Sequence, residues 1–208
     1  MKSPARVHVV DDDAAIREAL CALLDSVSIE AQAHASAKDF LAIASPGMDG
    51  CLVTDVRMPG MSGLELLQAM NDRGILIPVI VITGHGDVPM AVRAMKAGAV
   101  EFLLKPFNEQ DLLDRILDSL QSHDQNNHRA RLREQAASRF DDLTPREWEV
   151  LAQIMDCQHS KGIAHSLGIS EKTVDVHRFN IMRKTGVRNL PELIQLRLQA
   201  GDGLDAPA

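Results

Sequence analysis

The sequence predicts an α/β fold, a doubly wound five-stranded parallel sheet, followed by a smaller all-α domain of four helices. Two observations predict this division. Five short apolar segments alternate with five helical patterns over the first 120 residues, whereas only helical patterns follow residue 142. The chain has 208 residues, of which 45% are hydrophobic, so each part can build a core of its own.

The predicted strands are short runs that are rich in β-branched or apolar side chains. They are Val7–Val10, Glu30–Ala35, Cys51–Thr54, Val79–Ile82 and Glu101–Leu104. The predicted helices of this part cover residues 14–26, 37–43, 62–72, 87–97 and 108–120. Strands and helices that alternate in this way favour a parallel sheet with helices on both faces.

Capping signals mark two of these helix starts. Ser62 is followed three residues later by Glu65, which predicts a capping box. Asp87 precedes Pro89 and is the predicted cap of the fourth helix. These local signals agree with the alternating pattern.

A segment of different composition separates the two parts. From Gln121 to Asp142 the apolar periodicity fades into arginine, alanine, glutamine and other polar residues. Because alanine and glutamine favour helix, the segment either continues the fifth helix or is a flexible, solvated linker. We therefore expect one domain over residues 1–120, a linker over 121–142 and a second domain over 143–208.

The second domain shows four helical patterns. Thr144 and Glu147 form a predicted capping box that opens a helix to about Asp156. Ser160 is the predicted cap of the next helix, which ends at Leu167. The last two patterns cover Glu171–Thr185 and Pro191–Gln199. A short helix, a tight turn that contains glycine and a longer basic helix are typical of a helix-turn-helix.

The net charge of −7 is distributed unevenly. Residues 1–120 contain 10 basic and 17 acidic residues, whereas residues 158–198 contain seven basic and three acidic ones. An acidic front and a locally basic back indicate two different tasks. Aromatic residues make up only 3% of the chain, which disfavours a nucleic-acid surface built on stacked bases.

Cysteine usage and hydropathy exclude other classes of protein. Cys21, Cys51 and Cys157 are far apart and show no C-x-x-C spacing, so we expect neither a disulfide framework nor a zinc site. The start of the chain lacks a signal-peptide pattern, and the longest apolar run, Ile75–Thr83, is short and interrupted by Pro78. We therefore expect a soluble, cytoplasmic protein with no membrane partner.

Charged and hydroxyl side chains follow four of the predicted strands. Asp11 and Asp12 follow the first strand, Asp55 the third, Thr83 the fourth and Lys105 the fifth. Ligands of open α/β sheets bind beyond the carboxyl ends of the strands, where the strand order reverses, so these side chains are expected at one site. Three adjacent carboxylates need a cation, and oxygen ligands favour Mg²⁺. Lys105 and Thr83 suit a phosphoryl oxygen.

Taken one at a time, these residues have ordinary structural explanations. Asp12 or Asp13 can cap the following helix, Asp55 can begin a turn, and Lys105 can be a solvated surface residue. Their joint placement at the strand ends favours a functional site.

Three segments resemble the signature segments of two-component receiver domains, which have a flavodoxin-like fold: Val9–Asp13, Thr54–Gly63 and Lys105–Phe107. The resemblance covers about residues 5–120. It implies that Asp55 accepts the phosphoryl group. It also implies that Asp12, Asp55 and the backbone carbonyl of Arg57 bind Mg²⁺, while Asp11 acts on the metal through water.

The same resemblance assigns Thr83 and Lys105 to the phosphoryl group and implies a cis peptide bond between Lys105 and Pro106. It further implies a switch in which Thr83 moves toward the phosphoryl group and an aromatic residue, here Phe102, turns inward. An ordinary core role for Phe102 stays open. Arg57 and His85 are candidates for tuning the phosphoryl lifetime, with His85 orienting a water. The alternative for His85 is an exposed loop histidine without that role.

The second domain resembles the LuxR-type, four-helix output domain of FixJ/NarL regulators over about residues 140–200. The matching segments are Leu143–Glu147, Gly162–Ala164 and Gly168–Arg178. The resemblance implies that the residues that face bases are Asp175, Val176 and Phe179, and that the residues that face phosphates are Lys172, Arg183 and Lys184.

Four positions in this domain need separate comment. Asp175 stands where many relatives have a cation, and its carboxylate can accept a hydrogen bond from cytosine N4. His177 lies on the inner face of its helix, which favours packing. Cys157 stands where relatives commonly have glycine. Phe179 has a core role as its alternative.

Together these observations predict a two-component response regulator and not a dedicated enzyme. A sensor histidine kinase is expected to phosphorylate Asp55, and the phosphorylated chain is expected to form a homodimer through the fourth helix and fifth strand. The dimer would bind promoter DNA and activate transcription, with RNA polymerase as a further partner.

Three alternative functions stay open. The first is a hydrolase with an aspartate nucleophile, which would need an acid where Arg57 stands. The second is a receiver domain that binds proteins without being phosphorylated, and the third is a constitutive DNA-binding protein that uses the first domain only for dimerisation.

Overall fold

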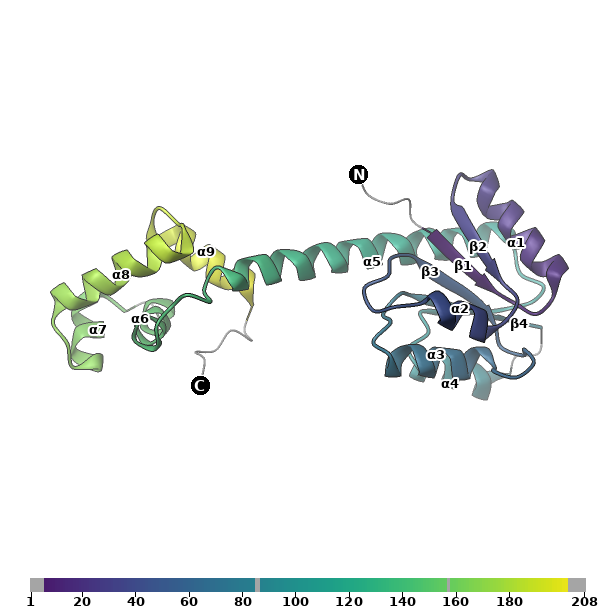
Figure 1. The fold of residues 1–208 in the computed structure, drawn as a ribbon, viewed down its shortest axis with the longest axis horizontal. Coiled ribbons are helices and arrows are strands. Elements are labelled where there is room, and N and C mark those ends of the chain that lie inside the picture. The colour runs from purple at the N-terminus through teal and green to yellow at the C-terminus, as the bar shows by residue number, and fades with distance from the viewer. Residues whose placement is uncertain (1–5, 85–86, 157, 202–208) are drawn as a thin grey trace. The chain divides into compact units, whose positions relative to one another are not determined.

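The computed structural model describes residues 6–84, 87–156 and 158–201. It divides into two compact units, Met1–Gln125 and Asn126–Ala208 (Figure 1). Each unit is described by itself.

The first unit is built on one five-stranded parallel sheet with the order β2-β1-β3-β4-β5. Its strands are β1 (Arg6–Val10), β2 (Glu30–His34), β3 (Cys51–Asp55), β4 (Val79–Thr83) and β5 (Glu101–Leu104). The predicted fold class is confirmed, and each predicted strand lies within one residue of the observed bounds. Because the strand order reverses between β1 and β3, the carboxyl ends of these two strands meet at the switch point of the sheet.

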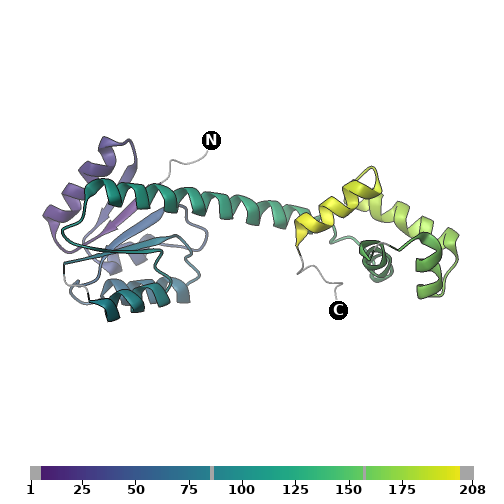
Figure 2. The same cartoon turned by 180° about the vertical axis from the view of Figure 1, so that it is seen from behind.

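Helices cover both faces of this sheet, as Figures 1 and 2 show. The helices of the unit are α1 (Ala14–Ser26), α2 (Ala37–Ile43), α3 (Gly63–Asp72), α4 (Val88–Lys96) and the first part of α5 (Glu109–Ser138), which continues past Gln125. Buried residues of α2, α3 and α4 pack on one face and buried residues of α1 and α5 on the other. The sheet is therefore doubly wound.

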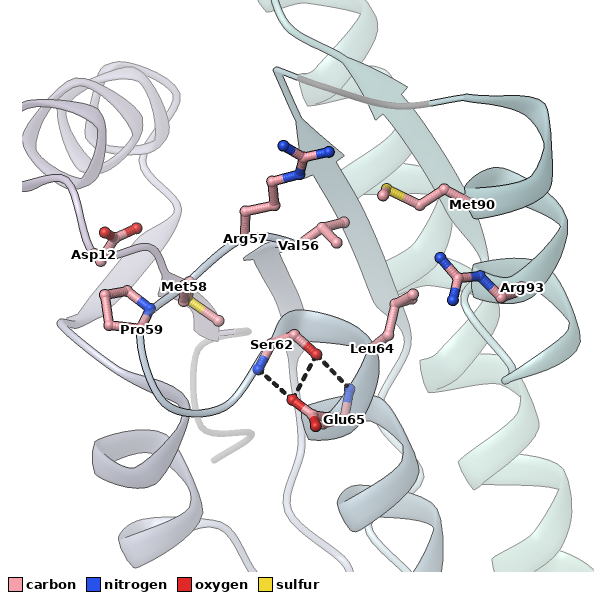
Figure 3. A pocket seen from close by; sticks show the side chains of 10 residues that line it. All are labelled: Asp12, Val56, Arg57, Met58, Pro59, Ser62, Leu64, Glu65, Met90 and Arg93. Carbon is pink, nitrogen blue, oxygen red and sulfur yellow. Dashed lines mark hydrogen bonds between the residues drawn. The ribbon is translucent and has the colours of Figure 1, made fainter.

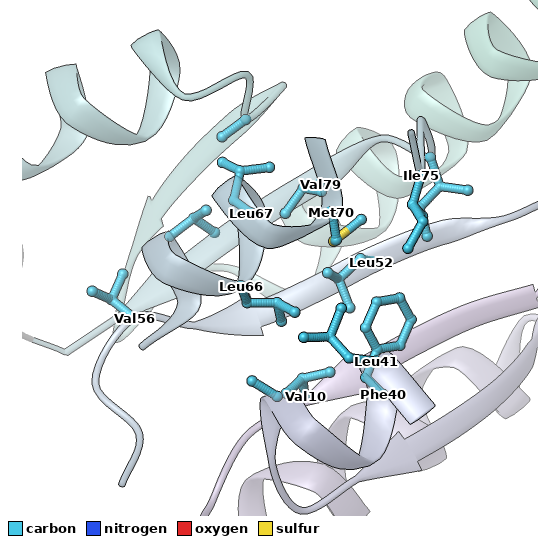
Figure 4. Close-up of a cluster of buried hydrophobic side chains, with 14 of the residues drawn as sticks. Val10, Phe40, Leu41, Leu52, Val56, Leu66, Leu67, Met70, Ile75 and Val79 are labelled. Atoms are coloured by element: carbon cyan, nitrogen blue, oxygen red, sulfur yellow. The ribbon is translucent and has the colours of Figure 1, made fainter. Parts of the chain in front are cut away.

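Strand residues alternate between the two cores. On β4, Val79 and Val81 belong to the cluster under α2, α3 and α4, which Figure 4 shows around Phe40 and Leu66. Ile80 and Ile82 belong to the cluster under α1 and α5. Because both faces are covered, β4 is apolar at every position up to its last residue, as expected for a parallel strand.

The predicted helix caps of the first unit are confirmed. Ser62 and Glu65 form a complete capping box at the start of α3, and the Asp87 side chain accepts a hydrogen bond from the Met90 amide at the start of α4. These caps fix where the two helices begin, close to the carboxyl edge of the sheet.

The segment between the predicted domains is helical over most of its length. Helix α5 runs for 30 residues and ends at Ser138. Its first part packs on the sheet through Leu112, Leu113 and Ile116. Of the two interpretations of residues 121–142, the structure shows the continued helix as far as Ser138.

The described residues of the second unit form four further helices: α6 (Pro145–Met155), α7 (Ser160–Leu167), α8 (Glu171–Thr185) and α9 (Leu190–Ala200). Their core joins Val150, Ile163, Val174 and Leu193 with Phe140. Gly168 has a positive φ of 65° and ends α7, because glycine adopts this left-handed conformation without a steric penalty. None of the helices among the described residues has the length and apolar character needed to cross a bilayer.

One predicted cap in this unit is wrong. The residue that precedes the first turn of α7 is His159, whose side chain makes no capping hydrogen bond. Ser160 is the first residue of the helix, and its hydroxyl bonds to residues of α8 instead. The capping box of Thr144 and Glu147 at α6 is confirmed.

Candidate functional site

The carboxyl edge of the sheet brings the predicted acidic residues together. Asp11, directly after β1, is 1% exposed. Its Oδ2 accepts a hydrogen bond from Lys105 Nζ at 2.9 Å and its Oδ1 accepts one from the Asp13 amide at 2.9 Å. Its backbone carbonyl accepts a hydrogen bond from Arg17 Nη1 at 2.7 Å. Asp11 is thus a buried carboxylate that is fully hydrogen-bonded.

Asp55 ends β3 and lies opposite Asp11 across the same lysine. It is 7% exposed, and its Oδ1 is 2.9 Å from Lys105 Nζ. Its Oδ2 accepts a hydrogen bond from the backbone amide of Arg57. Lys105 therefore bridges two buried carboxylates that come from different strands.

The charged form of Lys105 is favoured at this position. Burial alone lowers the pKa of the ammonium, but hydrogen bonds and charges from Asp11 and Asp55 outweigh it, and the pKa of Lys105 is raised. A permanently charged lysine between two carboxylates is suited to holding a further anionic group.

A pocket of about 710 Å³ adjoins this edge, and Figure 3 shows its lining. Asp12 and Arg57 line it from the loops that follow β1 and β3, and Met90 and Arg93 line it from α4. Asp12 is exposed, whereas Asp11 beside it is buried. The two adjacent acids therefore have different surroundings: Asp11 is buried in the protein, and Asp12 lines the pocket.

The remaining predicted residues of this site occupy the ends of β4 and β5. Thr83 is the last residue of β4 and is 1% exposed. Phe102 on β5 pairs with Val81 and is half-buried against the core under α4. The peptide bond between Lys105 and Pro106 is cis, as the resemblance implies. His85 lies outside the described residues.

Two residues that sequence reasoning did not assign also shape the edge. A Cβ on Gly63 would lie 2.2 Å from the carbonyl oxygen of Asp55, so only glycine permits the close approach of α3 to β3. Arg17 holds the carbonyl of Asp11. The only signal for Arg17 in the sequence is a cation in the first turn of a helix that follows three acids.

The donor set at this edge consists of hard oxygen atoms, which Mg²⁺ prefers. Asp12 lies in the loop after β1 and Asp55 is the last residue of β3, and the backbone carbonyl of Arg57 follows two residues after Asp55. Among the described residues, no group of three or more acidic, histidine or cysteine side chains can hold a metal without other ligands. A cation here would need backbone and water oxygens in addition, as Mg²⁺ commonly does.

A second candidate site is the outer face of α8. Val174, Ile181 and Thr185 face the core, and Val176 and Phe179 are 52% and 62% exposed. A core role for Phe179 is therefore excluded. The outer face also carries two exposed cations predicted to contact phosphates, Lys172 and Arg183.

Three other residues of α8 make contacts within the unit. The Nζ of Lys184 lies 2.7 Å from Glu147 Oε2 and 2.9 Å from the Asp142 carbonyl, so its charge is used in holding α8 to the start of α6. Asp175 Oδ1 accepts a hydrogen bond from Ser160 at 3.1 Å, and Arg178 donates to the same hydroxyl at 2.8 Å. The predicted phosphate contact of Lys184 is not supported by this arrangement.

His177 is half-buried, in keeping with the packing role expected for it. Cys157 lies outside the described residues.

Comparison with known families matches both units. Residues 7–117 match the response regulator receiver domain, and residues 141–197 match the bacterial regulatory proteins of the luxR family. The two matches cover the acidic edge and the helix-turn-helix, respectively.

Individual relatives match over nearly the whole chain. The chain is 46% identical over 195 residues to the transcriptional regulatory protein FixJ of Azorhizobium caulinodans, covering 94% of this chain and 92% of FixJ. It is 40% identical over 199 residues to the response regulator protein TodT of Pseudomonas putida, covering 96% of this chain and 88% of TodT. The names of these relatives describe regulators and not dedicated enzymes.

Solved structures agree with this assignment. A structure of the response regulator StyR has a TM-score of 0.83 and 46% identity, and the match covers 95% of this chain and 100% of StyR. A structure of full-length FixJ from B. japonicum has a TM-score of 0.59 and 39% identity, covering 96% and 98%. The chain therefore belongs to the two-component response regulators that join a receiver domain to a LuxR-type DNA-binding domain.

Proposed function

We propose that Asp55 accepts a phosphoryl group from a sensor histidine kinase in the cytoplasm and that this controls DNA binding. The observation that carries the proposal is the bridge of Lys105 between Asp55 and Asp11 beside a pocket that contains Asp12. A nucleophilic carboxylate, a fixed cation and a free carboxylate then share one edge, as phosphoryl transfer requires.

Mg²⁺ fits this edge through the carboxylates of Asp12 and Asp55 and the backbone carbonyl of Arg57, with Asp11 acting through water. When bound, it would offset the negative charge of the carboxylates and of the incoming phosphoryl group. Lys105 supplies the second positive charge, and its raised pKa keeps it protonated at neutral pH.

The chain's own residues account for the transfer. An oxygen of Asp55 attacks the phosphorus of a phosphohistidine, the P–N bond breaks, and its electron pair stays on the imidazole nitrogen. The product is an acyl phosphate on Asp55. Lys105 and the Thr83 hydroxyl would then bind phosphoryl oxygens, and Arg57 and His85 would tune the lifetime of the acyl phosphate.

The output step follows from the second unit. We propose that phosphorylation favours a homodimer through α4 and β5, and that Thr83 and Phe102 carry the change to this surface. The exposed face of α8 would bind promoter DNA through Lys172, Val176, Phe179 and Arg183, with Asp175 at its edge. Transcription would be activated with RNA polymerase.

The experiment incubates the full chain with acetyl phosphate and Mg²⁺ and compares intact mass, oligomeric state and DNA recovered from a genomic library. Wild type is expected to gain the mass of one phosphoryl group, to dimerise and to enrich specific DNA. Asp55→Asn should do none of these, whereas Asp25→Asn, which changes an exposed aspartate of α1, should behave as wild type.

Two outcomes would contradict the proposal. An adduct that persists in Asp55→Asn would place the phosphoryl group elsewhere. Wild-type transcription from Asp55→Asn in cells would instead support a receiver domain that works without phosphorylation.

A further inference from the structure

Arg17 occupies an unusual position for a cation. It lies in the first turn of α1, near the helix end that carries a partial positive charge and where acidic residues are normally preferred. No acidic residue lies in the first turn itself; the nearby acidic residues are the N-cap Asp13 and the two that precede it, Asp11 and Asp12. The guanidinium is partly buried and donates to the Asp11 carbonyl at 2.7 Å, which indicates that its position is fixed by this contact.

The hydrogen bond from Arg17 is made to the carbonyl group of the peptide bond between Asp11 and Asp12. Every other polar atom of Asp11 is also held, because its amide donates to the His34 carbonyl at 3.4 Å and its two carboxylate oxygens accept hydrogen bonds. Asp12 differs, since no hydrogen bond or ion pair from the described part of the chain holds its carboxylate. The direction of the Asp12 side chain therefore depends on its backbone.

We propose that Arg17 is a positioning residue for cation binding at the acidic edge. By holding the carbonyl oxygen of Asp11, it fixes the peptide plane between Asp11 and Asp12 and thereby directs the Asp12 carboxylate into the pocket. Arg17 itself does not touch the cation or the phosphoryl group. This inference rests on the proposed function because it assumes that the edge binds Mg²⁺.

The direction in which Mg²⁺ affinity changes when Arg17 is replaced distinguishes a positioning role from a purely electrostatic one. Removing a positive charge near three carboxylates lowers the repulsion felt by an incoming cation, so electrostatics alone predicts tighter Mg²⁺ binding. Positioning predicts weaker binding, because Asp12 loses its fixed direction. Residues that orient metal ligands typically change metal affinity by about 10- to 100-fold when they are replaced.

The test titrates the full chain with Mg²⁺ by isothermal calorimetry and, independently, by the Mg²⁺-dependent rise in thermal unfolding temperature. Intrinsic fluorescence is not suited to this purpose, because the single tryptophan, Trp148, lies in the second unit. The variants are Arg17→Met, which keeps the apolar stem, and Arg17→Lys, which keeps a charged donor.

Arg73→Met is the matched control. Arg73 Nη1 also donates to a backbone carbonyl, that of Leu41, at 3.1 Å, but at the end of α3 and away from the acidic edge. This variant removes the same number of charges from the same unit, so it should retain the wild-type affinity for Mg²⁺.

Arg17→Met is expected to bind Mg²⁺ about tenfold more weakly than wild type, with Arg17→Lys between the two. Unchanged or tighter binding by Arg17→Met would overturn the inference while leaving the proposed function intact. If Arg17→Met does not fold, as shown by circular dichroism, Arg17→Lys and Arg17→Gln decide by the same criterion. Absence of Mg²⁺ binding by wild type would instead contradict the metal site of the proposed function.

Discussion

At the scale of single residues, Phe179 shows how exposure decides between two roles. An aromatic residue on a short helix is usually part of a core, but this one is 62% exposed between Lys172 and Arg183 on the outer face of α8. Its apolar surface suits the thymine methyl group in a major groove, whereas the two cations suit phosphates. Specificity and salt dependence should therefore depend on different residues of this face.

Phe179→Ala is expected to lower discrimination at one base pair by about 1 kcal/mol and to leave the salt dependence of binding unchanged. Arg183→Ala should weaken binding to all sequences and reduce the slope of log affinity against log salt by about one. Binding titrations with selected DNA at several salt concentrations measure both. Unchanged discrimination at every base pair in Phe179→Ala would contradict a base contact by this residue.

A pair of buried histidines gives the receiver domain a predictable response to acid. His8 Nδ1 and His34 Nε2 are 3.1 Å apart, and both rings contact Phe40. Burial, and then the charges of His34 and Arg6, lower the pKa of His8 to about 4 from its ordinary value of 6.5. The unfolded chain therefore binds more protons than the folded one between these two values.

The resulting stability is fully present above about pH 6.5 and is lost as the pH falls toward 4. Urea unfolding followed by far-ultraviolet circular dichroism should show this loss, with Trp148 fluorescence reporting the second unit separately. His8→Asn should flatten the pH dependence, whereas replacement of the exposed His165 by asparagine should leave it as in wild type. A steep loss that persists in His8→Asn would assign the effect to other groups.

At the scale of elements, an ion pair with a buried glutamate connects α8 to the start of α6. Glu147 is 3% exposed and accepts hydrogen bonds from Lys184 Nζ at 2.7 Å and from the Thr144 amide at 2.8 Å. Burial raises the pKa of Glu147, but these hydrogen bonds and the charge of Lys184 outweigh burial, so the pKa of Glu147 is lowered. The pair is therefore ionised in the folded state.

Lys184→Met is expected to lower the free energy of unfolding of the second unit by about 2 kcal/mol, because it leaves a buried carboxylate without its cation. Trp148 lies one residue from Glu147 on α6, so its fluorescence during urea unfolding reports this loss. The salt slope of DNA binding should change less in Lys184→Met than in Arg183→Ala. The reverse order would return Lys184 to the DNA interface.

Most elements could be predicted from the sequence because local signals and burial agree in them. Strand β4 reads as apolar at almost every position, and Ser62 with Glu65 marks the start of α3 without tertiary information. The role of Ser160 could not be predicted from local signals alone. A serine before a helix can cap it or bond elsewhere, and only the neighbouring Asp175 and Arg178 on α8 decide which.

The acidic edge shows the same limit. Asp55, Thr83 and Lys105 follow strands that a pattern can locate, and strand ends meet at a known edge of the sheet. Arg17 and Gly63 contact the backbone carbonyl groups of Asp11 and Asp55. A contact with a backbone carbonyl cannot be predicted from the pattern of side chains in the sequence. Likewise, the helical end of α5 lacks apolar periodicity, so only its alanine and glutamine content favoured helix.

At the scale of the whole molecule, the total charge describes neither unit. The net charge of −7 would disfavour DNA, yet residues 1–120 contain all of this excess, and residues 158–198 contain four more basic than acidic residues. An excess of four is modest, so one DNA-binding unit should bind weakly and two should be needed for a stable complex. The proposed phosphorylation-dependent dimer would then control DNA binding by bringing two such units together.

The expected need for two DNA-binding units leads to a prediction about the spacing of half-sites in the DNA. On DNA with a single half-site, phosphorylation should change the affinity of the full chain less than twofold, because the α8 surface is the same. On DNA with two half-sites one helical turn apart, phosphorylation should raise affinity by about 10- to 100-fold, because the second contact becomes intramolecular. Inserting about half a turn, roughly five base pairs, between the half-sites should abolish the gain. Gel-shift titrations with wild type and Asp55→Asn measure each case. An equal gain on single and paired half-sites would show that phosphorylation acts by releasing the α8 surface within one chain and not by pairing two chains.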